Sequence, residues 1–551
     1  MTMDPRYMAL RTLYQTLLDS DPARLRVIAR QWGVDLAATR KPDMAAELMT
    51  GMASNEAVTR VLDQLTPGQR TALDDLLRHD GAVPWAVFVH RAGEVRVLGP
   101  GRVEREELWR APASAAEALW HLGLVQRAFD DWEGHPVEIA FVPEDLRLYA
   151  PAPSPLDIPD LAPASSSATW TAVEDTLADN LVDVWADVQR ASGGPLDLSN
   201  LDERRRLLVA LSLEQGWLRR DADGQVRPVA KAMLAWLQAD PWTQWTSLAE
   251  AWLTSKAWDD LAHVSSLRPD PALGWPGHPE PPRQGIANLL GHCLANTAYD
   301  IESFVAYVKE HATFFLRRDG DYETWAPRAA DSEVPLRGFT AWDEIEGALI
   351  RHTITGPLHW LGLLDLGSNA AGGETTAFRL TEAAAATMQD APPPTFPEPD
   401  RVQLHEGAVL SVPRRRRYER FQLSRIADAL DTPLAEAVHY RLSPTSLRRA
   451  KQQRIPLARI IAFLTEATGS KVLPAHLQAA VRRAYGERSP ARLGQHWLLR
   501  VADPATLDEP EITALTVHRM APTIATLRVQ DRAQACRVLL KNGILVDLDE
   551  T

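Results

Sequence analysis

The stretch HYRLSPTSLRRAKQQRIPLARIIAFLTEATGSKVLPAHLQAAVRRAYG, residues 439–486, indicates the local fold most directly. Pro444, Pro456 and Pro474 stand at positions where helices can begin. After each proline, apolar residues recur at the spacing that places side chains on one side of a helix. Ser443 is the residue type that caps a helix start. The stretch therefore predicts three short helices in a helix-turn-helix-like bundle.

This bundle lies in a basic block of an acidic protein. The whole chain has a formal net charge of −14, but residues 401–500 hold 19 basic and 7 acidic side chains, a net of +12. The rest of the chain therefore carries −26. Such an asymmetry points to a module that faces a polyanion and is attached to an acidic body. The alternative is that the basic and acidic parts dock on each other.

Four consecutive arginines open a second helical pattern in the block, RRRRYERFQLSRIADALD, residues 414–431. Its apolar residues Leu423, Ile426, Ala427 and Leu430 predict one helix side. Cations at a helix start oppose the helix dipole, so helix stabilisation does not explain the arginines. They could contact a nucleic-acid backbone, an acidic protein surface, or only solvent. The candidate nucleic-acid contacts are Arg414, Arg415, Arg416, Arg417, Arg420, Arg448, Arg449, Lys451 and Arg454; Arg482 and Arg483 also lie on the polar side of the bundle.

Proline-rich stretches around 150–168, 268–283 and 391–400 suggest domain boundaries. Between them, a helix that ends near glycine is repeatedly followed by two short strands around a Gly- or Asp-rich turn, a pattern typical of winged-helix modules. Such modules bind DNA in many proteins and act as protein–protein spacers in others. The fold class predicted is α+β, mainly α. The predicted domains are 1–150, a SAP-like helical region plus a winged-helix-like module; 168–268, winged-helix-like and Trp-rich; 283–390, winged-helix-like; and 400–551, basic and mixed α/β.

No pattern typical of an enzyme occurs. The phosphate-binding loop G-x-x-x-x-G-K-[ST] and the motifs H-E-x-x-H and G-x-S-x-G are missing, so we expect no catalytic residue, cofactor or metal. The acids of DEIE, 343–346, fit a helix start. DGDYE, 319–323, fits the turn of a strand–turn–strand segment. Tryptophans such as Trp245 and Trp252 have the spacing of core residues.

The basic block resembles the accessory domain that precedes the motor in XPB-type DNA helicases and that also occurs in helicase-associated proteins without a motor. The resemblance rests on FQLSRIADALDTP, HYRLSPTSLRRA and LPAHLQAAVRRAYG, in the order of that family. It covers about 401–548 and implies a role beside a helicase in DNA repair or transcription. It does not imply ATPase activity, because the motor is missing from this chain.

The sequence thus predicts a non-enzymatic DNA-associated protein that acts with a helicase motor in trans and contacts the DNA backbone. One alternative is a protein–protein scaffold of winged-helix modules that does not bind DNA; another is a sequence-specific transcription regulator. The sequence has neither an apolar run of signal-peptide type nor one of membrane-span length, so we expect a cytoplasmic protein with no membrane contact, nucleoid-associated if it binds DNA.

Overall fold

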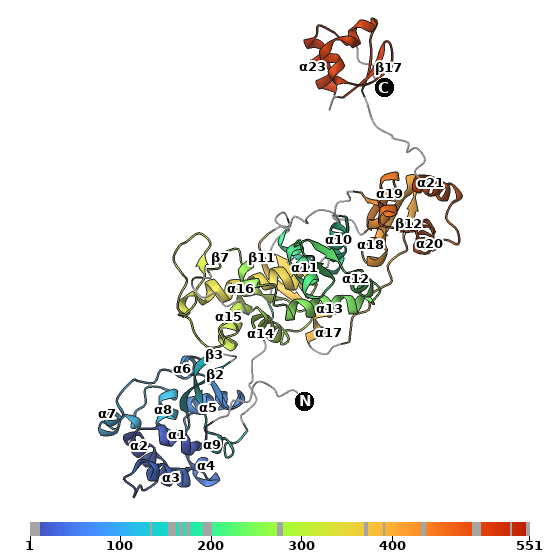
Figure 1. The fold of residues 1–551 in the computed structure, drawn as a ribbon. Helices are drawn as coiled ribbons and strands as arrows, with labels where there is room; N and C mark the ends of the chain where they lie inside the picture. The colour runs from blue at the N-terminus through green and yellow to red at the C-terminus, as the bar shows by residue number, and fades with distance from the viewer. Residues whose placement is uncertain are drawn as a thin grey trace. The chain divides into compact units, whose positions relative to one another are not determined.

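A computed structural model describes residues 11–132, 135–152, 161–164, 169–171, 177–190, 201–270, 272, 279–368, 373–388, 392–430, 437–486, 497–528 and 532–546 (Figure 1). The protein is α+β and mainly helical, with several small sheets. It divides into two compact units: unit 1 is residues 1–401, 412–425 and 432–438, and unit 2 is residues 402–411, 426–431 and 439–551. No helix in the described ranges is long and apolar enough to cross a membrane.

Unit 1 begins with four helices around a core of aliphatic side chains. They are α1 (Leu13–Asp19), α2 (Pro22–Trp32), α3 (Lys41–Met52) and α4 (Asn55–Leu62). Asp21 caps α2 by accepting from the N–H of Ala23, and Gly33 ends it with a left-handed φ of 66°. The helix, extended loop and helix of the SAP-like prediction are present here as α2, a loop and α3.

Two segments of unit 1 have the element order of a winged helix. The first is α5 (Pro67–Arg78), β1 (Ala82–Pro84), α6 (Trp85–Ala92), α7 (Pro100–Arg105), η1 (Leu108–Arg110), α8 (Ala115–Leu122), β2 (Gln126–Trp132), β3 (His135–Phe141) and α9 (Glu144–Arg147). Its strands are ordered β1-β3-β2, so the strand between the helices pairs with the last strand of the hairpin.

The second such segment lies further along the chain. It consists of α14 (Glu280–Leu290), β8 (Tyr299–Asp300), α15 (Ile301–His311), a long helix made of η5 (Asp343–Gly347), α16 (Ala348–Thr353) and η6 (Ile354–Leu358), then β10 (Leu364–Ser368), β11 (Thr375–Leu380) and α17 (Glu382–Met388). The order β8-β11-β10 matches that of the first segment, and β4 (Thr169–Thr171) extends the sheet beside β10. β7 (Leu267–Arg268), β9 (Arg328–Ala329) and η4 (Phe339–Ala341) belong to the connections.

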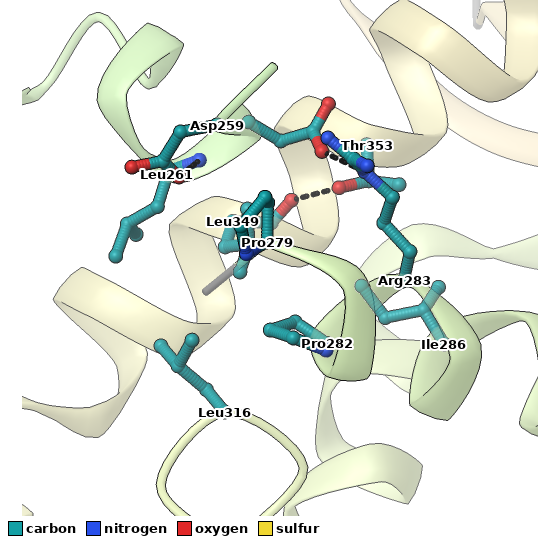
Figure 2. A pocket seen from close by; sticks show the side chains of 10 residues that line it. Asp259, Leu261, Pro279, Pro282, Arg283, Ile286, Leu316, Leu349 and Thr353 are labelled. Carbon is teal, nitrogen blue, oxygen red and sulfur yellow. Dashed lines mark hydrogen bonds and ion pairs between the residues drawn. The ribbon is translucent and has the colours of Figure 1, made fainter. Parts of the chain in front are cut away.

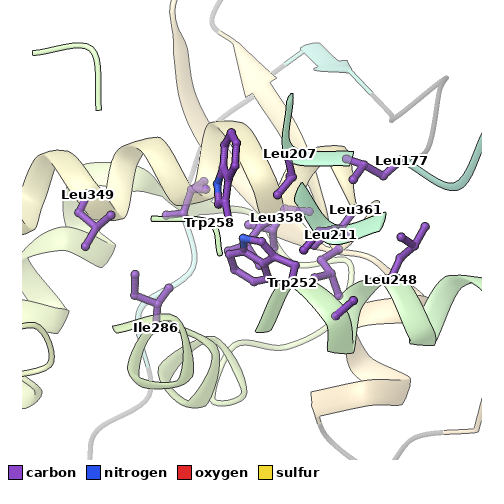
Figure 3. Close-up of a cluster of buried hydrophobic side chains, with 14 of the residues drawn as sticks. Leu177, Leu207, Leu211, Leu248, Trp252, Trp258, Ile286, Leu349, Leu358 and Leu361 are labelled. Atoms are coloured by element: carbon purple, nitrogen blue, oxygen red, sulfur yellow. The ribbon is translucent and has the colours of Figure 1, made fainter. Parts of the chain in front are cut away.

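The elements between these segments build a tryptophan-rich core. They are α10 (Leu177–Arg190), α11 (Glu203–Glu214), β5 (Leu218–Arg220), β6 (Val226–Pro228), α12 (Ala230–Leu237), α13 (Pro241–Thr254) and η2 (Asp260–His263). Trp252 and Trp258 lie among Leu207, Leu211 and Leu358 (Figure 3). Trp245 and Trp252 are buried, which confirms that their spacing marked core positions.

Unit 2 holds the predicted three-helix bundle, most of one four-stranded sheet and a three-stranded sheet. The first sheet has the order β12-β13-β15-β14, formed by β12 (Gln403–His405), β13 (Val409–Pro413), β14 (Asp428–Ala429) and β15 (Ala437–Arg441), with η7 (Glu406–Ala408) in between. The bundle follows as α19 (Pro444–Gln452), α20 (Leu457–Thr468) and α21 (Ala475–Tyr485). The last part contains β16 (Trp497–Arg500), η8 (Pro504–Asp508), α22 (Pro510–Leu515), β17 (Thr516–Ala521), β18 (Ile524–Leu527) and α23 (Arg532–Lys541).

Helix α18 (Arg417–Ile426), which follows the four arginines, belongs to unit 1 except for its last residue. Its Phe421 joins the tryptophan-rich core, with its ring 6.5 Å from that of Trp185. The helix is shorter than predicted, because Leu430 pairs through its N–H with the carbonyl of His439, at 2.8 Å, as an extended residue.

The strand–turn–strand prediction around DGDYE is wrong. Residues 314–327 form successive turns, and the Asp321 carboxylate accepts from the N–H groups of Glu323 and Thr324 at 2.8 and 3.0 Å. An aspartate that bonds its own following backbone stabilises a turn in place of a strand ladder.

Candidate nucleic-acid interface

Helices α19–α21 carry a concentrated positive charge. Residues 437–486 include nine Lys or Arg side chains and a single acidic one, Glu466. The helices are fixed by local signals: Ser443 Oγ accepts from the N–H of Ser446, and Ser446 Oγ accepts from the N–H of Ser443, both at 3.0 Å. Because Leu447 and Ala450 are buried on one side of α19, the cations on its other side face solvent.

The C-terminal ends of α19 and α21 meet. The Tyr485 hydroxyl at the end of α21 donates to the carbonyl of Ile455, after α19, at 2.8 Å. The Lys451 ammonium lies 5.9 Å from the centre of the Tyr485 ring. Arg454 forms the turn between these groups with a left-handed φ of 58°. The Arg454 side chain in this turn is exposed.

Four exposed cations lie on these two helices and on the turn that follows α19, and we name them the basic face: Arg448, Lys451, Arg454 and Arg482. Arg448 and Lys451 are three residues apart on α19, and Arg482 precedes Tyr485 by the same spacing on α21. Arg483 is also exposed, one position further round α21. Cations in the last turn of a helix additionally complement its dipole.

Arg449, the remaining candidate on α19, has a different role. Its guanidinium donates to the Asp428 carboxylate at 3.0 Å and to the carbonyl of Ala427 at 2.7 Å. The side chain is half-buried and joins α19 to the end of α18 and β14 within unit 2. We therefore assign it to the fold and not to the basic face.

The arginine cluster at 414–420 lies in unit 1, and most of it has acidic partners. Arg417 is 7% exposed; its Nε donates to Asp179 at 2.8 Å and its Nη1 to Gln244 Oε1 at 2.7 Å. Arg420 is 0% exposed and donates to the Asp183 carboxylate at 2.6 Å. A phosphate from solvent does not reach either guanidinium in this arrangement, which corrects their prediction as DNA contacts.

The rest of the cluster divides between partnered and exposed side chains. Arg416 donates to Glu398 and Glu419, and to the carbonyls of Pro399 and Asp400. Arg414 is half-buried, with its carbonyl accepting from Arg420 at 3.1 Å, whereas Arg415 is exposed. The structure therefore supports the acidic-surface alternative for Arg416, Arg417 and Arg420.

The sequence of α10 contains a pattern that indicates the acidic partners of Arg417 and Arg420. Asp179, Asp183 and Asp187 recur every four residues in DNLVDVWADVQR, along a helix whose other residues are mainly apolar. Residues with that spacing share one side of a helix. Arg417 and Arg420, three residues apart on α18, meet the first two of them. Matching stripes of opposite charge would have predicted the partner, although 238 positions separate Arg417 from Asp179.

In the first segment, α8 directly precedes the hairpin, the place that the recognition helix takes in DNA-binding winged helices, and it is covered. No residue of α8 is exposed, and the helix contains no Lys or Arg. Arg24 of α2 stacks over the Trp120 ring at 3.5 Å and donates to the Trp120 carbonyl at 3.2 Å. Burial lowers the pKa of His121 in the same helix to about 4.

The helix before the hairpin of the second segment, η5–α16–η6, is largely covered, although Asp343 and Glu344 at its start are exposed. Its π-helical, α-helical and π-helical parts bury Ile345, Leu349 and Leu358 in the core. Glu346, in the DEIE motif, is 0% exposed and accepts from Arg317 Nε at 2.8 Å. The DEIE motif begins the helix, as predicted, with Asp343 and Glu344 exposed and Glu346 enclosed.

A pocket in unit 1 is built from a structural ion pair (Figure 2). Arg283 donates to the Asp260 carboxylate at 2.5 Å and to the carbonyls of Trp252 and Ser255, while the indoles of Trp252 and Trp258 donate to Asp260. The cavity beside it measures about 20 Å³, enough for one water molecule. It is too small for an organic substrate.

Nearby, titratable side chains from three elements meet without forming a metal site. Glu203 Oε1 lies 3.4 Å from His352 Nε2 and 3.9 Å from His263 Nδ1. Burial raises the pKa of Glu203 and lowers that of His263 to about 4. Within the described ranges, no group of three or more His, Cys, Asp or Glu side chains could hold a metal ion.

Comparison of the chain with models of known protein families and with curated proteins gave no match.

Proposed function

We propose that this protein is a non-enzymatic, DNA-associated helicase-accessory protein whose unit 2 contacts the nucleic-acid backbone. The observation that carries the proposal is the basic face on α19–α21 in a chain of opposite net charge. Cations on rigid helices neutralise phosphates without reading sequence. The resemblance of residues 401–548 to helicase accessory domains supports the setting and a motor protein in trans as partner. A cytoplasmic, nucleoid-associated location belongs to the same proposal.

A second function is favoured by a separate observation. The coverage of α8, and of most of the η5–α16–η6 helix, supports a scaffold role for unit 1, in which these modules hold other elements or partners in place of DNA. The two roles are compatible, because they concern different units. A sequence-specific regulator receives less support, since it needs an exposed base-reading helix.

The test is a fluorescence-anisotropy titration of the full-length protein with labelled DNA at low and moderate salt. The test variant is Arg448→Gln/Arg482→Gln, which removes two cations of the basic face. The matched control is Arg219→Gln/Arg220→Gln, which removes two exposed cations from β5 in unit 1. The net charge changes equally in both.

We expect salt-sensitive binding that weakens in the test variant and persists in the control. Equal weakening in both variants would show that overall charge, and not the basic face, controls binding. Absence of binding in the unaltered protein would refute the DNA proposal and leave the scaffold role. Residues 414–417 are left unchanged in both variants, because Arg417 is buried in unit 1.

A further inference from the structure

We infer that the basic face binds double-stranded DNA in preference to single-stranded DNA. The inference rests on the proposed function, and it concerns the form of nucleic acid that the face recognises. Proteins that hold single strands combine cations with aromatic side chains on which the bases stack. A surface that lacks such rings gains no stacking energy from unpaired bases.

The aromatic rings of the bundle and its sheet serve the fold. Among the described residues 437–486, none of the Tyr and Phe side chains is classed as exposed: Tyr440 is buried, and Phe463 and Tyr485 are half-buried. Tyr485 uses its hydroxyl on the Ile455 carbonyl, and the Lys451 ammonium lies over its ring. The one ring beside the basic face is thus committed to joining α19 and α21.

Without stacking, charge density decides between the two forms of DNA. A duplex carries one phosphate per about 1.7 Å of its axis, twice the density of one of its strands. Cations held on packed helices and on the turn between them gain most from the polyanion that presents the most phosphates. A flexible single strand must in addition lose conformational freedom to follow a rigid surface.

Counterion release gives the two forms different salt dependences. If the four cations of the basic face each neutralise one phosphate, the slope of log K against log salt is about −3.6 for a duplex and about −2.8 for a single strand. From about 50 to 200 mM salt, affinity should fall roughly 150-fold for the duplex and roughly 50-fold for the single strand.

The experiment titrates the full-length protein with a duplex and with one of its strands, across this salt range. The preference stands if the duplex binds more tightly at low salt with the steeper slope, and if Arg448→Gln/Arg482→Gln makes the duplex slope shallower by about 1.8. It is overturned if the single strand binds as tightly as the duplex.

A Trp497→Ala variant identifies the cause of such a failure. Trp497, on β16 of unit 2, is 41% exposed and is the aromatic residue available for stacking there. Loss of single-strand binding in this variant would place recognition on β16 and overturn the inference while leaving DNA association intact. If neither form binds, the proposed function itself fails.

Discussion

Replacing Asp179 with alanine should destabilise unit 1 strongly. The side chains of Asp179 and Arg417 are 4% and 7% exposed and are joined at 2.8 Å. Without the carboxylate, Arg417 keeps Gln244 as a neutral acceptor but loses its buried ion-pair partner. Removing one partner of a buried ion pair costs about 3–5 kcal/mol of unfolding free energy. A loss of that size should release α18 from unit 1 before the rest of the unit unfolds.

A surface carboxylate provides the matched control. Glu106 pairs with Arg102 at 3.0 Å, but the two side chains are 47% and 57% exposed. Glu106→Ala also removes one carboxylate and one ion pair from unit 1, at a cost of about 0–1 kcal/mol. The difference in unfolding free energy between the two variants therefore measures the effect of burying the ion pair.

Urea unfolding followed by tryptophan fluorescence measures the effect, since Trp185 contacts Phe421 of α18. Hydrogen exchange of the α18 amides locates the loss, which matters because a chain of two units need not unfold in one step. Replacing Asp179 and Arg417 together with leucine should cost less than the sum of the single changes, because no charge stays buried. The buried pair does not stabilise unit 1 as described if Asp179→Ala lowers the free energy of unfolding no more than Glu106→Ala does. The same conclusion follows if Asp179→Ala changes the salt dependence of DNA binding without reducing stability.

Three further outcomes are expected. Arg454→Gly should stabilise unit 2 by up to about 1 kcal/mol, because glycine accepts the left-handed φ of 58° without strain. The same change should make the salt slope of DNA binding shallower by about 0.9, because one cation of the basic face is removed. A loss of stability measured by urea unfolding would contradict the first expectation. Ser443→Ala should cost about 1 kcal/mol by removing the cap of α19, which urea unfolding also measures. His121 and His263 have pKa values lowered to about 4, below the unfolded value near 6.5; their contribution to stability is therefore present above about pH 6.5 and lost as the pH falls toward 4. Unfolding midpoints from neutral to acidic pH check this, and His121→Gln should flatten the dependence.

Local patterns predicted much of the fold, because caps and periodicity act over a few residues. Ser443 and Pro444 marked the start of α19, and the apolar spacing of α13 marked Trp245 and Trp252 as core. The hairpins of both winged helices followed from their turn residues. Periodicity continued the pattern of α18 to Leu430, where tertiary pairing with His439 imposed an extended conformation.

The candidate site was harder to predict, because the role of a charged side chain depends on the group that it contacts in the folded chain. Arg417 and Arg448 are the same residue type within one basic block, yet one neutralises Asp179 inside unit 1 and the other faces solvent. The partner of Arg417 comes from a distant helix, so neither composition nor spacing within the block could separate the two. The coverage of α8 by α2 is likewise a tertiary fact that the winged-helix pattern does not contain.

The place of α18 also constrains how this protein can change over evolution. A domain added at the end of a gene normally forms a continuous segment that can be lost again without harm. Here residues 412–425 stand inside the later part of the chain, yet they supply Phe421 to the core of the earlier part. A gene shortened after codon 401 would encode a unit 1 whose Asp179 and Trp185 have lost Arg417 and Phe421. A chain that ends at 401 should therefore fold into a less stable unit 1 than the full chain does, because it lacks part of its own core.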